Sequence, residues 1–397
     1  MVLPSDGDAS GRRFGEAELA NLRAVLESGT LNCTRGTFVS RLEAEFAARY
    51  GGDGFFCTAV TSGTAAIHCA LAALELEIGD EVVTTSVTDM GAITPILFCG
   101  AVPVFADIGA HTFNISAQSI EAVLTPRTRA VVATHLFGSP CDMDAIGALC
   151  QKRGLRLIED AAQAPYATWN EKRAATMSDL GCFSLQQGKH FSCGEGGLVL
   201  TRDPELARRV RLFHDKAWGY GDAHPDHYFA APNYRLTELA GAVALAQLDR
   251  VEEVVRDRQH WARDFQEQIA GLPGVSVQLV PDGGQSVFWK VTLRIEPQEA
   301  GADVRQVGAH LKERGIACAP RYVQKPAFEC EVLRDKRTLG SSGWPLQDVV
   351  WPDTLSLPGT YDALAHMLVL PWNENYTAQH VGFIAGSLRE TLDFLRA

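Results

Sequence analysis

The stretch Ser184-Leu185-Gln186-Gln187-Gly188-Lys189-His190-Phe191-Ser192-Cys193-Gly194-Glu195-Gly196-Gly197 places one lysine in a glycine-rich turn. Apolar segments at residues 181–185 and 197–201 flank it, which predicts a turn between two buried strands. A lysine that forms an imine must be partly desolvated, so that its amine is neutral at working pH. Glycines let the backbone pass close to a ligand. Lys189 is therefore a candidate reactive group, although a lone lysine between strands is usually a solvated surface side chain.

A second polar segment lies at the end of another predicted strand. Leu157-Ile158-Glu159-Asp160-Ala161-Ala162-Gln163 runs from apolar residues directly into an acidic pair. Ligands of open α/β sheets bind at the carboxyl ends of the strands, and an aspartate there can hold a protonated pyridine nitrogen. The plainer alternative is that Asp160 caps the helix that follows.

Two further segments could hold a phosphate. Thr61-Ser62-Gly63-Thr64-Ala65-Ala66 opens an apolar helix, whose free N–H groups and dipole attract anions. Ser184 can add a hydroxyl group to such a site. Asn233-Tyr234-Arg235-Leu236-Thr237-Glu238 opens a later helix, and a polar side chain there could also reach a phosphate. Both segments have the plainer explanation of helix capping.

The order of predicted elements indicates an α/β fold. Short β-branched strands alternate with helices up to about residue 235, which predicts a largely parallel sheet covered on both faces. A long helix at 237–272 and an α+β region follow, so we predict a large domain at 1–250 and a small one at 251–397. The expected strands are 81–85, 102–106, 130–135, 155–159, 181–185, 197–201, 275–279 and 286–295, and the other expected helices are 14–28, 38–50, 88–99, 116–124, 142–153, 304–314 and 378–394.

Composition narrows the class of protein. The 397 residues carry a formal net charge of -12, which makes nucleic acid an unfavourable partner. Residues 1–13 lack the apolar core of a signal peptide, and no apolar run is long enough to span a bilayer, so a cytoplasmic protein is expected. The ten cysteines are dispersed without a CxxC pair, which favours free buried thiols over disulfides, and no metal site is predicted.

In this order, the segments resemble the DegT/DnrJ/EryC1/StrS family of pyridoxal-phosphate (PLP) aminotransferases, within fold-type I. The resemblance covers nearly the whole chain, from Arg13-Phe14-Gly15-Glu16 through Gly100-Ala101-Val102-Pro103-Val104-Phe105 to Leu370-Pro371-Trp372-Asn373-Glu374. It implies a large domain with a mostly parallel mixed sheet flanked by helices, and a smaller C-terminal α+β domain. The implied activity moves an amino group from glutamate or glutamine to a nucleotide-linked, free or cyclitol keto-sugar, in amino-sugar or antibiotic biosynthesis.

The resemblance also implies a role for individual residues. Lys189 resembles the lysine that forms a Schiff base with the cofactor and shuttles the proton, and Asp160 resembles the partner of the pyridine nitrogen. Gln163 resembles the residue packed near the ring and its phenolic oxygen. In the family, the position of Asn233 reaches the phosphate of a neighbouring subunit's cofactor, which implies a homodimer with shared active sites. The remaining phosphate-binding positions are matched by Gly63, Thr64 and Ser184.

The chain departs from the family at one position. An aromatic residue often stacks on the PLP ring where this chain has Asp89, and a carboxylate does not stack as an aromatic ring does. We expect Asp89 or Met90 to lie over the ring, or Asp89 to cap the next helix. His190 and Phe191 are further candidates for lining the pocket.

Two alternatives to transamination remain open. Dehydratases of this family have a histidine in place of the Schiff-base lysine, whereas Lys189 is present here with His190 beside it. A regulatory protein that binds PLP without catalysis is the other alternative. The acceptor is not readable from the sequence, but a loop at 321–328 is the predicted contact with it. A substrate phosphate could be met by Arg12, Lys216, Arg321 or Lys325, each of which could equally be a solvated surface charge.

Overall fold

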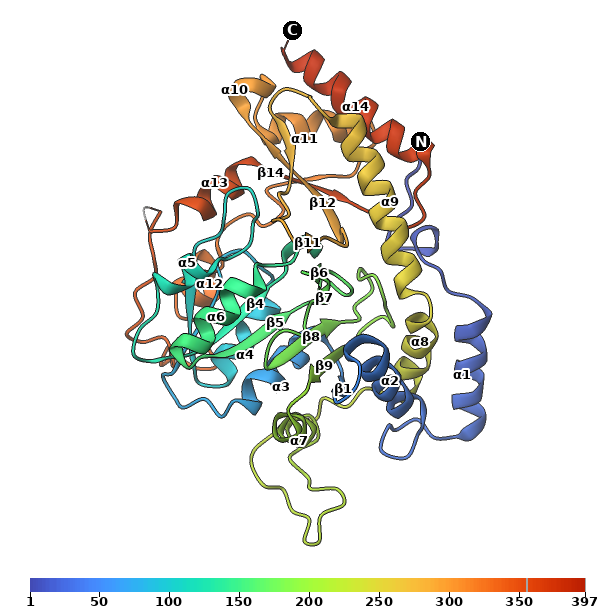
Figure 1. The fold of residues 1–397 in the computed structure, drawn as a ribbon, viewed down its shortest axis with the longest axis vertical. Helices are drawn as coiled ribbons and strands as arrows, with labels where there is room; N and C mark the ends of the chain where they lie inside the picture. The colour runs from blue at the N-terminus through green and yellow to red at the C-terminus, as the bar shows by residue number, and fades with distance from the viewer. Residues whose placement is uncertain (355, 397) are drawn as a thin grey trace.

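The computed structural model describes residues 1–354 and 356–396, and its larger sheet has seven strands in the order β1-β9-β8-β5-β4-β2-β3 (Figure 1). Neighbouring strands from β3 to β8 in this order are parallel, whereas β9 is antiparallel to both of its neighbours. The predicted α/β class and mostly parallel sheet are therefore confirmed. The strands are β1 Phe56–Val60, β2 Glu81–Thr85, β3 Val102–Ala106, β4 Thr128–Thr134, β5 Arg156–Asp160, β8 Leu180–Ser184 and β9 Gly197–Thr201.

The direction of β9 follows from its short connection to β8. Parallel neighbours need a crossover, usually through a helix, whereas a direct loop joins antiparallel strands. The lysine-bearing turn is such a loop, so β8 and β9 form a hairpin. The helices of this part of the chain are α1 Glu16–Ser28, α2 Phe38–Phe46, α3 Gly63–Ala73, α4 Thr94–Phe98, α5 Ala117–Glu121, α6 Met143–Arg153, α7 Pro204–Phe213 and α8 Glu238–Leu248.

The predicted helix at 88–99 is wrong in its first half. Thr88 and Asp89 lie outside any helix, Met90–Ala92 form one 3-10 turn, and α4 begins only at Thr94. Pro95 occupies the first turn of α4 and has no N–H to continue a helix from the preceding residues. Asp89 is thereby left in extended backbone, after a bend at residues 86–88 that follows β2.

The predicted helix at 237–272 is also wrong, because two helices stand in its place. Thr237 caps α8, accepting a hydrogen bond from the Ala240 amide at 3.3 Å, and α9 spans Val251–Ile269 after a break at Asp249 and Arg250. α8 packs against α1 and α2, while α9 packs against α14 (Figure 1). The spacing of apolar residues along the sequence does not show that the two helices pack against different elements. The division of the chain into domains at residue 250 stays a prediction.

The C-terminal part contains a second, antiparallel sheet in the order β10-β12-β14-β13. The expected strand at 286–295 is correct only from Lys290 onward, because Ser286–Trp289 turn toward the larger sheet, where the Val287 amide donates to the Gly138 carbonyl at 3.0 Å. A small sheet of order β11-β6-β7 lies between the two parts. The elements are β6 Thr168–Trp169, β7 Lys172–Arg173, β10 Val275–Val277, β11 Gly284–Gln285, β12 Lys290–Ile295, β13 Ala319–Pro320, β14 Met367–Pro371, α10 Pro297–Ala300, α11 Val304–Glu313, α12 Glu331–Arg334, α13 Pro358–His366 and α14 Ala378–Arg396.

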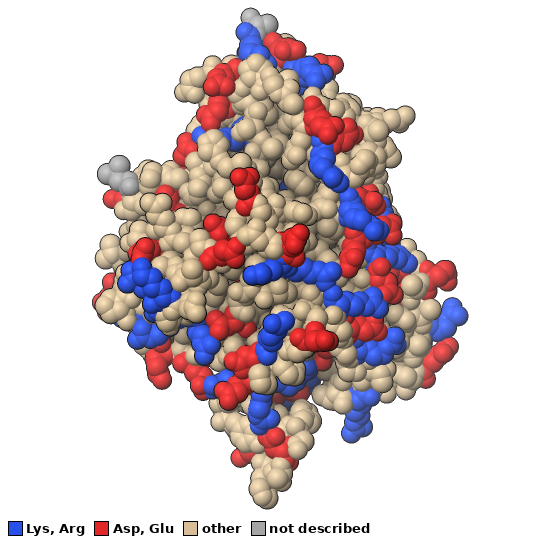
Figure 2. Space-filling model, in the orientation of Figure 1, with Lys and Arg blue, Asp and Glu red and all other residues tan. Residues whose placement is uncertain are grey.

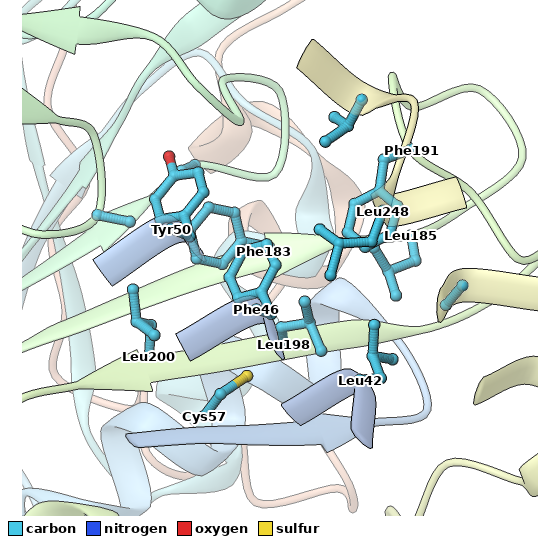
Figure 3. Close-up of a cluster of buried hydrophobic side chains, with 14 of the residues drawn as sticks. Leu42, Phe46, Tyr50, Cys57, Phe183, Leu185, Phe191, Leu198, Leu200 and Leu248 are labelled. Atoms are coloured by element: carbon cyan, nitrogen blue, oxygen red, sulfur yellow. The ribbon is translucent and has the colours of Figure 1, made fainter. Parts of the chain in front are cut away.

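One buried core cluster anchors the β8–β9 hairpin. Phe46 of α2 lies edge-on to Phe183 of β8 at 5.0 Å and stacks with Phe191 at 6.1 Å (Figure 3). Leu185 and Phe191 are fully or almost fully buried and stand on either side of the lysine in sequence. Burying large apolar side chains contributes about 1.5–3 kcal/mol each, so both ends of the turn are fixed in the core.

The surface of the visible face carries acidic and basic side chains interspersed, without a large field of one sign (Figure 2). Among the described residues, none of the helices has the length and apolar character needed to cross a bilayer. All ten cysteines are free thiols.

A buried ion cluster joins the two ends of the chain. The fully buried Arg258 of α9 pairs with Glu374 at 2.7 Å and with Asp6 at 3.0 Å. Removing one partner of a buried pair leaves an uncompensated charge and destabilises the folded protein by about 3–5 kcal/mol.

We therefore predict that Arg258→Leu lowers the free energy of unfolding by about that amount, measured by denaturant titration. Arg256→Leu, an exposed position on the same helix, is the matched control, and equal effects of the two variants would contradict this prediction.

Candidate active site

A cavity of about 670 Å³ opens at the carboxyl ends of β4, β5 and β8, next to the N-terminus of α3. This is the edge at which ligands of open α/β sheets bind. The predicted site residues, with one exception, meet there: the cavity is lined by Gly63, Thr64, Asp89, Asp160, Gln163, Ser184 and Lys189. Asn233 is the exception, because it is exposed and lies outside this cavity.

Lys189 stands on a turn that backbone and side-chain hydrogen bonds hold closed. The Lys189 amide donates to the Gln186 carbonyl at 2.9 Å, and the Gln187 amide donates to the Gly194 carbonyl at 2.9 Å. Two distant side chains fix the turn from outside. Trp289 Nε1 donates to the Gly188 carbonyl at 2.7 Å, and Arg12 Nη1 donates to the Lys189 carbonyl at 2.8 Å. The position of the lysine thus depends on the N-terminal segment and on the C-terminal part of the chain.

The surroundings of Lys189 favour a neutral amine. Burial lowers the pKa of Lys189 from 10.5 to about 8, although the carboxylates of Asp160, Asp89 and Glu195 oppose the shift. The Nζ atom lies 4.1 Å from the centre of the Trp289 ring. A lysine with a pKa near 8 supplies a substantial fraction of free amine close to neutral pH, which nucleophilic attack on a carbonyl requires.

Asp160 is buried at the end of β5 and faces the same cavity. Burial raises its pKa, while hydrogen bonds from the Ala162 amide at 3.0 Å and the Thr134 hydroxyl at 3.2 Å, together with the charge of Lys189, favour the carboxylate. Gln163 accepts a hydrogen bond from the Phe137 amide at 2.6 Å through Oε1. Its NH₂ group remains to donate to a ligand.

The first turn of α3 forms a cradle for an anion. Ser62 caps the helix by accepting from the Ala65 amide at 3.0 Å, which leaves the Gly63 and Thr64 amides to a ligand. A Cβ atom on Gly63 would lie 2.8 Å from Cβ of Ser184, so a side chain would fill the cradle. This cradle, the carboxylate of Asp160 and the amine of Lys189 together fit the phosphate, the ring nitrogen and the aldehyde of PLP.

Asp89 caps a short turn and also lines the cavity. Its Oδ1 accepts from the Gly91 amide at 2.8 Å, so it caps the 3-10 turn Met90–Ala92, and it also lines the cavity with Met90. A Cβ atom on Gly91 would lie 2.5 Å from the Thr64 hydroxyl, which shows how closely this turn approaches α3. Which of the two residues covers a cofactor ring stays a prediction.

Several lining residues escaped sequence reasoning. Trp289 and Phe137 form an aromatic wall together with Tyr322 of the predicted loop, and Glu195 adds a carboxylate. Phe137 follows β4 by three residues, so the strand-end rule could have found it. Trp289 comes from the C-terminal part of the chain and has no local signal. Tyr322 and Val323 of the loop at 321–328 line the cavity, while contact of this loop with the acceptor stays a prediction.

Other candidates lie elsewhere. Phe191 belongs to the core, and His190 is buried with Nε2 2.9 Å from the Val287 carbonyl, so neither lines the cavity. Their prediction as lining residues is wrong because Phe191 packs against Phe46 in the core and His190 faces the Val287 carbonyl. The basic candidates have protein partners or lie outside the cavity: Arg12 pairs with Asp6, Lys216 pairs with Asp215, Arg321 donates to the Gln324 carbonyl, and Lys325 is absent from the cavity lining.

Comparisons with known proteins agree with this geometry. A family model described as the DegT/DnrJ/EryC1/StrS aminotransferase family matches residues 12–367. Spore coat polysaccharide biosynthesis protein SpsC of Bacillus subtilis (strain 168) is 35% identical over 309 residues, which are 76% of this chain and 78% of that protein. GDP-perosamine synthase of Caulobacter vibrioides is 36% identical over 263 residues, 66% of this chain and 70% of that protein. The structure of S. venezuelae DesV in complex with a ketimine intermediate has a TM-score of 0.84 at 29% identity, covering 95% of this chain and 94% of that chain.

The pKa of Lys189 makes a direct prediction for the cofactor-free protein. Because burial lowers this pKa to about 8, the rate of acetylation at Lys189 should rise about tenfold per pH unit below pH 8 and level off above it. Competitive acetylation followed by mass spectrometry measures this rate, with the exposed Lys152 as reference. A rate that keeps rising to pH 10 would show that the amine is not desolvated.

Proposed function

The chain belongs to the DegT/DnrJ/EryC1/StrS aminotransferase family, and we propose that within it the protein uses PLP to move an amino group from glutamate or glutamine to a keto-sugar or cyclitol ketone. One observation carries the proposal. The desolvated amine of Lys189 faces the carboxylate of Asp160 across a cavity that also contains an anion cradle. Sugar acceptors are supported by the relatives, since one of them is a GDP-perosamine synthase.

Different residues bind different parts of the cofactor in this proposal. Gly63 and Thr64 amides and the Ser184 hydroxyl bind its phosphate, and Asp160 keeps its ring nitrogen protonated. PLP bound there supplies a ring that withdraws electrons from the carbon beside the amino group. Lys189 attaches the cofactor through Nζ. Once released, the same neutral amine would move a proton between the donor's Cα and the cofactor carbon on the other side of the amino nitrogen.

The cavity wall limits water near the amine. Leu136 and Phe137 follow β4, Trp289 lies against Lys189, and all three are at least nine-tenths buried. A low-polarity wall keeps Lys189 neutral and the proton on the path between donor and amine. Because one cavity serves both donor and acceptor, the two half-reactions alternate and ping-pong kinetics follow.

The positions of Lys189 and His190 disfavour the dehydratase alternative. His190 points to the Val287 carbonyl and away from the cavity, while Lys189 occupies the reactive position. A binder without catalysis would not require a desolvated lysine. The predicted production of amino sugars for antibiotics or surface polysaccharides is part of the proposal, with SpsC as the relative that supports it.

A homodimer with shared sites completes the proposal. The segment between α7 and α8 projects from the body (Figure 1) and exposes Tyr220, Tyr228 and Phe229. Exposed aromatic side chains on a projecting segment are typical of an interface. Asn233 lies at the base of this segment and is solvent-exposed, so it is free to bind a phosphate in a second copy.

The cofactor assignment makes the central prediction. Borohydride reduction of the PLP-loaded protein should fix the cofactor to Lys189 alone, and glutamate or glutamine should remove its visible absorbance. Asp160→Asn should keep PLP but reduce the rate of this change at least about a hundredfold, because an amide does not stabilise the protonated ring nitrogen. Peptide mapping identifies the lysine, and stopped-flow absorbance gives the rate. Modification of another lysine, or a full rate in Asp160→Asn, would overturn the assignment.

Subunit mixing tests the shared site. Lys189→Ala and Asn233→Asp are each expected to be inactive alone. A hybrid dimer then has one site with both defects and one site with neither, so activity should recover toward about one quarter of wild type after random exchange of equal amounts. Exchange is verified by native mass spectrometry. Exchange without recovered activity would mean that each site is built from one chain.

A further inference from the structure

A buried histidine–carboxylate pair lies next to the candidate active site and has no part in the proposed chemistry. His135 directly follows β4, and Glu159 is the penultimate residue of β5. Both side chains are completely buried, and His135 Nε2 lies 3.0 Å from Oε2 of Glu159. Neither residue lines the cavity, so the presence of two polar side chains here needs another explanation.

The hydrogen bonds around the imidazole ring assign its proton. The Cys141 amide donates to Nδ1 of His135 at 3.1 Å. An amide N–H only donates, so Nδ1 accepts, and the ring proton lies on Nε2 and is donated to Glu159. Glu159 also accepts hydrogen bonds from the amides of Ala175 at 2.8 Å and Met177 at 2.9 Å. The carboxylate is thus held by three donors, and it fixes the orientation of the imidazole ring.

The chain on either side of His135 holds two side chains that face the cavity. Before it, the Thr134 hydroxyl donates to Oδ2 of Asp160 at 3.2 Å. After it, the Phe137 amide donates to Oε1 of Gln163 at 2.6 Å. The His135 amide itself donates to the Asp160 carbonyl at 3.1 Å. The orientation of both cavity-facing side chains therefore depends on where this segment lies.

The backbone at Phe137 adopts a conformation that needs support. Its φ is +59°, in the left-handed region that a bulky side chain rarely adopts. Such a residue persists only where the surrounding structure holds it. Gly138 follows without room for a side chain, since a Cβ atom there would lie 2.8 Å from the Trp289 amide nitrogen. A strained and closely packed turn therefore requires that the residue before it, His135, be fixed in place.

Stability alone does not account for this pair. Apolar side chains of similar volume serve the stability of a core as well as a buried polar pair does. Apolar side chains cannot supply a directed hydrogen bond, which fixes the rotation of a ring as well as its position. The bond between His135 and Glu159 thus supplies orientation at the start of the turn.

We propose that Glu159, acting through His135, is a positioning residue of the active site. The pair fixes the turn at 136–138 and thereby orients Gln163 toward the cofactor, without contact with cofactor or substrate. This inference rests on the proposed function, in which Gln163 lies beside the phenolic oxygen of PLP. The anchoring of the turn itself does not depend on whether PLP is bound.

The first measurement is hydrogen–deuterium exchange of the full chain without cofactor. Asparagine at position 135 keeps an acceptor for the Cys141 amide but is too short to donate to Glu159, whereas glutamine keeps the donor. His135→Asn should raise the exchange rate of residues 135–139 at least about tenfold relative to residues 197–201 of β9. His135→Gln should leave this ratio within about threefold of the wild-type value. Mass spectrometry of the corresponding peptides gives both rates.

The second measurement is the visible absorbance of the PLP-loaded protein as a function of pH. A donor to the phenolic oxygen stabilises negative charge there, so the proton on the attached nitrogen of Lys189 is held less strongly. Misplacing Gln163 in His135→Asn should therefore raise the pH midpoint of the absorbance change by about half a unit or more. His135→Gln should keep the wild-type midpoint. Gln163→Leu removes the donor outright and gives the full shift for reference.

Two further variants separate positioning from a loss of stability. Leu388→Ala removes buried apolar contacts of α14 in a different core cluster, so it should lower the Tm and leave the exchange ratio and the midpoint unchanged. Glu159→Gln should raise the exchange of residues 135–139 as His135→Asn does. The double variant should add no more than about twofold, because both changes break the same bond.

The outcomes separate this inference from the proposed function. Wild-type exchange in His135→Asn, an equal increase in His135→Gln, or additive effects in the double variant would overturn the positioning role. If His135→Asn does not fold, Glu159→Gln and His135→Gln decide the same question. If PLP gives no visible absorbance with the protein, the proposed function fails, and the exchange rates still decide whether the pair anchors the turn.

Discussion

Desolvation of one amine, Nζ of Lys189, is the constraint on which the arrangement of this chain depends. A lysine with a pKa of about 8 must be kept from water, and a buried amine is stable only where the surrounding structure holds it. The turn is therefore anchored by Leu185 and Phe191 in the core and by hydrogen bonds from Trp289 and Arg12. Reactivity at one atom thus requires contacts from residues that are far apart in the sequence.

The buried ion cluster connects this turn to the rest of the molecule. Asp6 pairs with Arg258 and Arg12, and Arg12 in turn binds the Lys189 carbonyl. The backbone carbonyl of Asp6 also accepts from Gln187 Nε2 at 2.9 Å. Buried charges demand partners with fixed geometry, so the N-terminal segment, α9 and the lysine turn are held together as one network. Loss of any member would disturb the turn as well as the stability of the fold.

The local sequence is sufficient to predict the site residues at strand ends. It is insufficient to predict the residues that long-range packing brings to the site. Asp160, Ser184 and Lys189 follow apolar strands, so the rule for parallel sheets groups them at one edge without knowledge of the fold. Trp289 and Arg12 donate hydrogen bonds to the same turn from distant parts of the chain. No pattern in their neighbouring residues predicts these contacts. The break between α8 and α9 was missed for a related reason, since it depends on which elements each helix packs against.

Asp89 shows how a structural role can leave a functional question open. Its hydrogen bond to the Gly91 amide accounts for an oxygen acceptor at this position, and asparagine or serine would serve about as well. The cap does not account for a negative charge beside two other carboxylates, because like charges in one cavity repel. The charge acts on Lys189, because the Asp89 carboxylate raises the pKa that burial lowers. The carboxylate therefore bears on the protonation of the reactive amine, whereas the cap only fixes where the backbone turns.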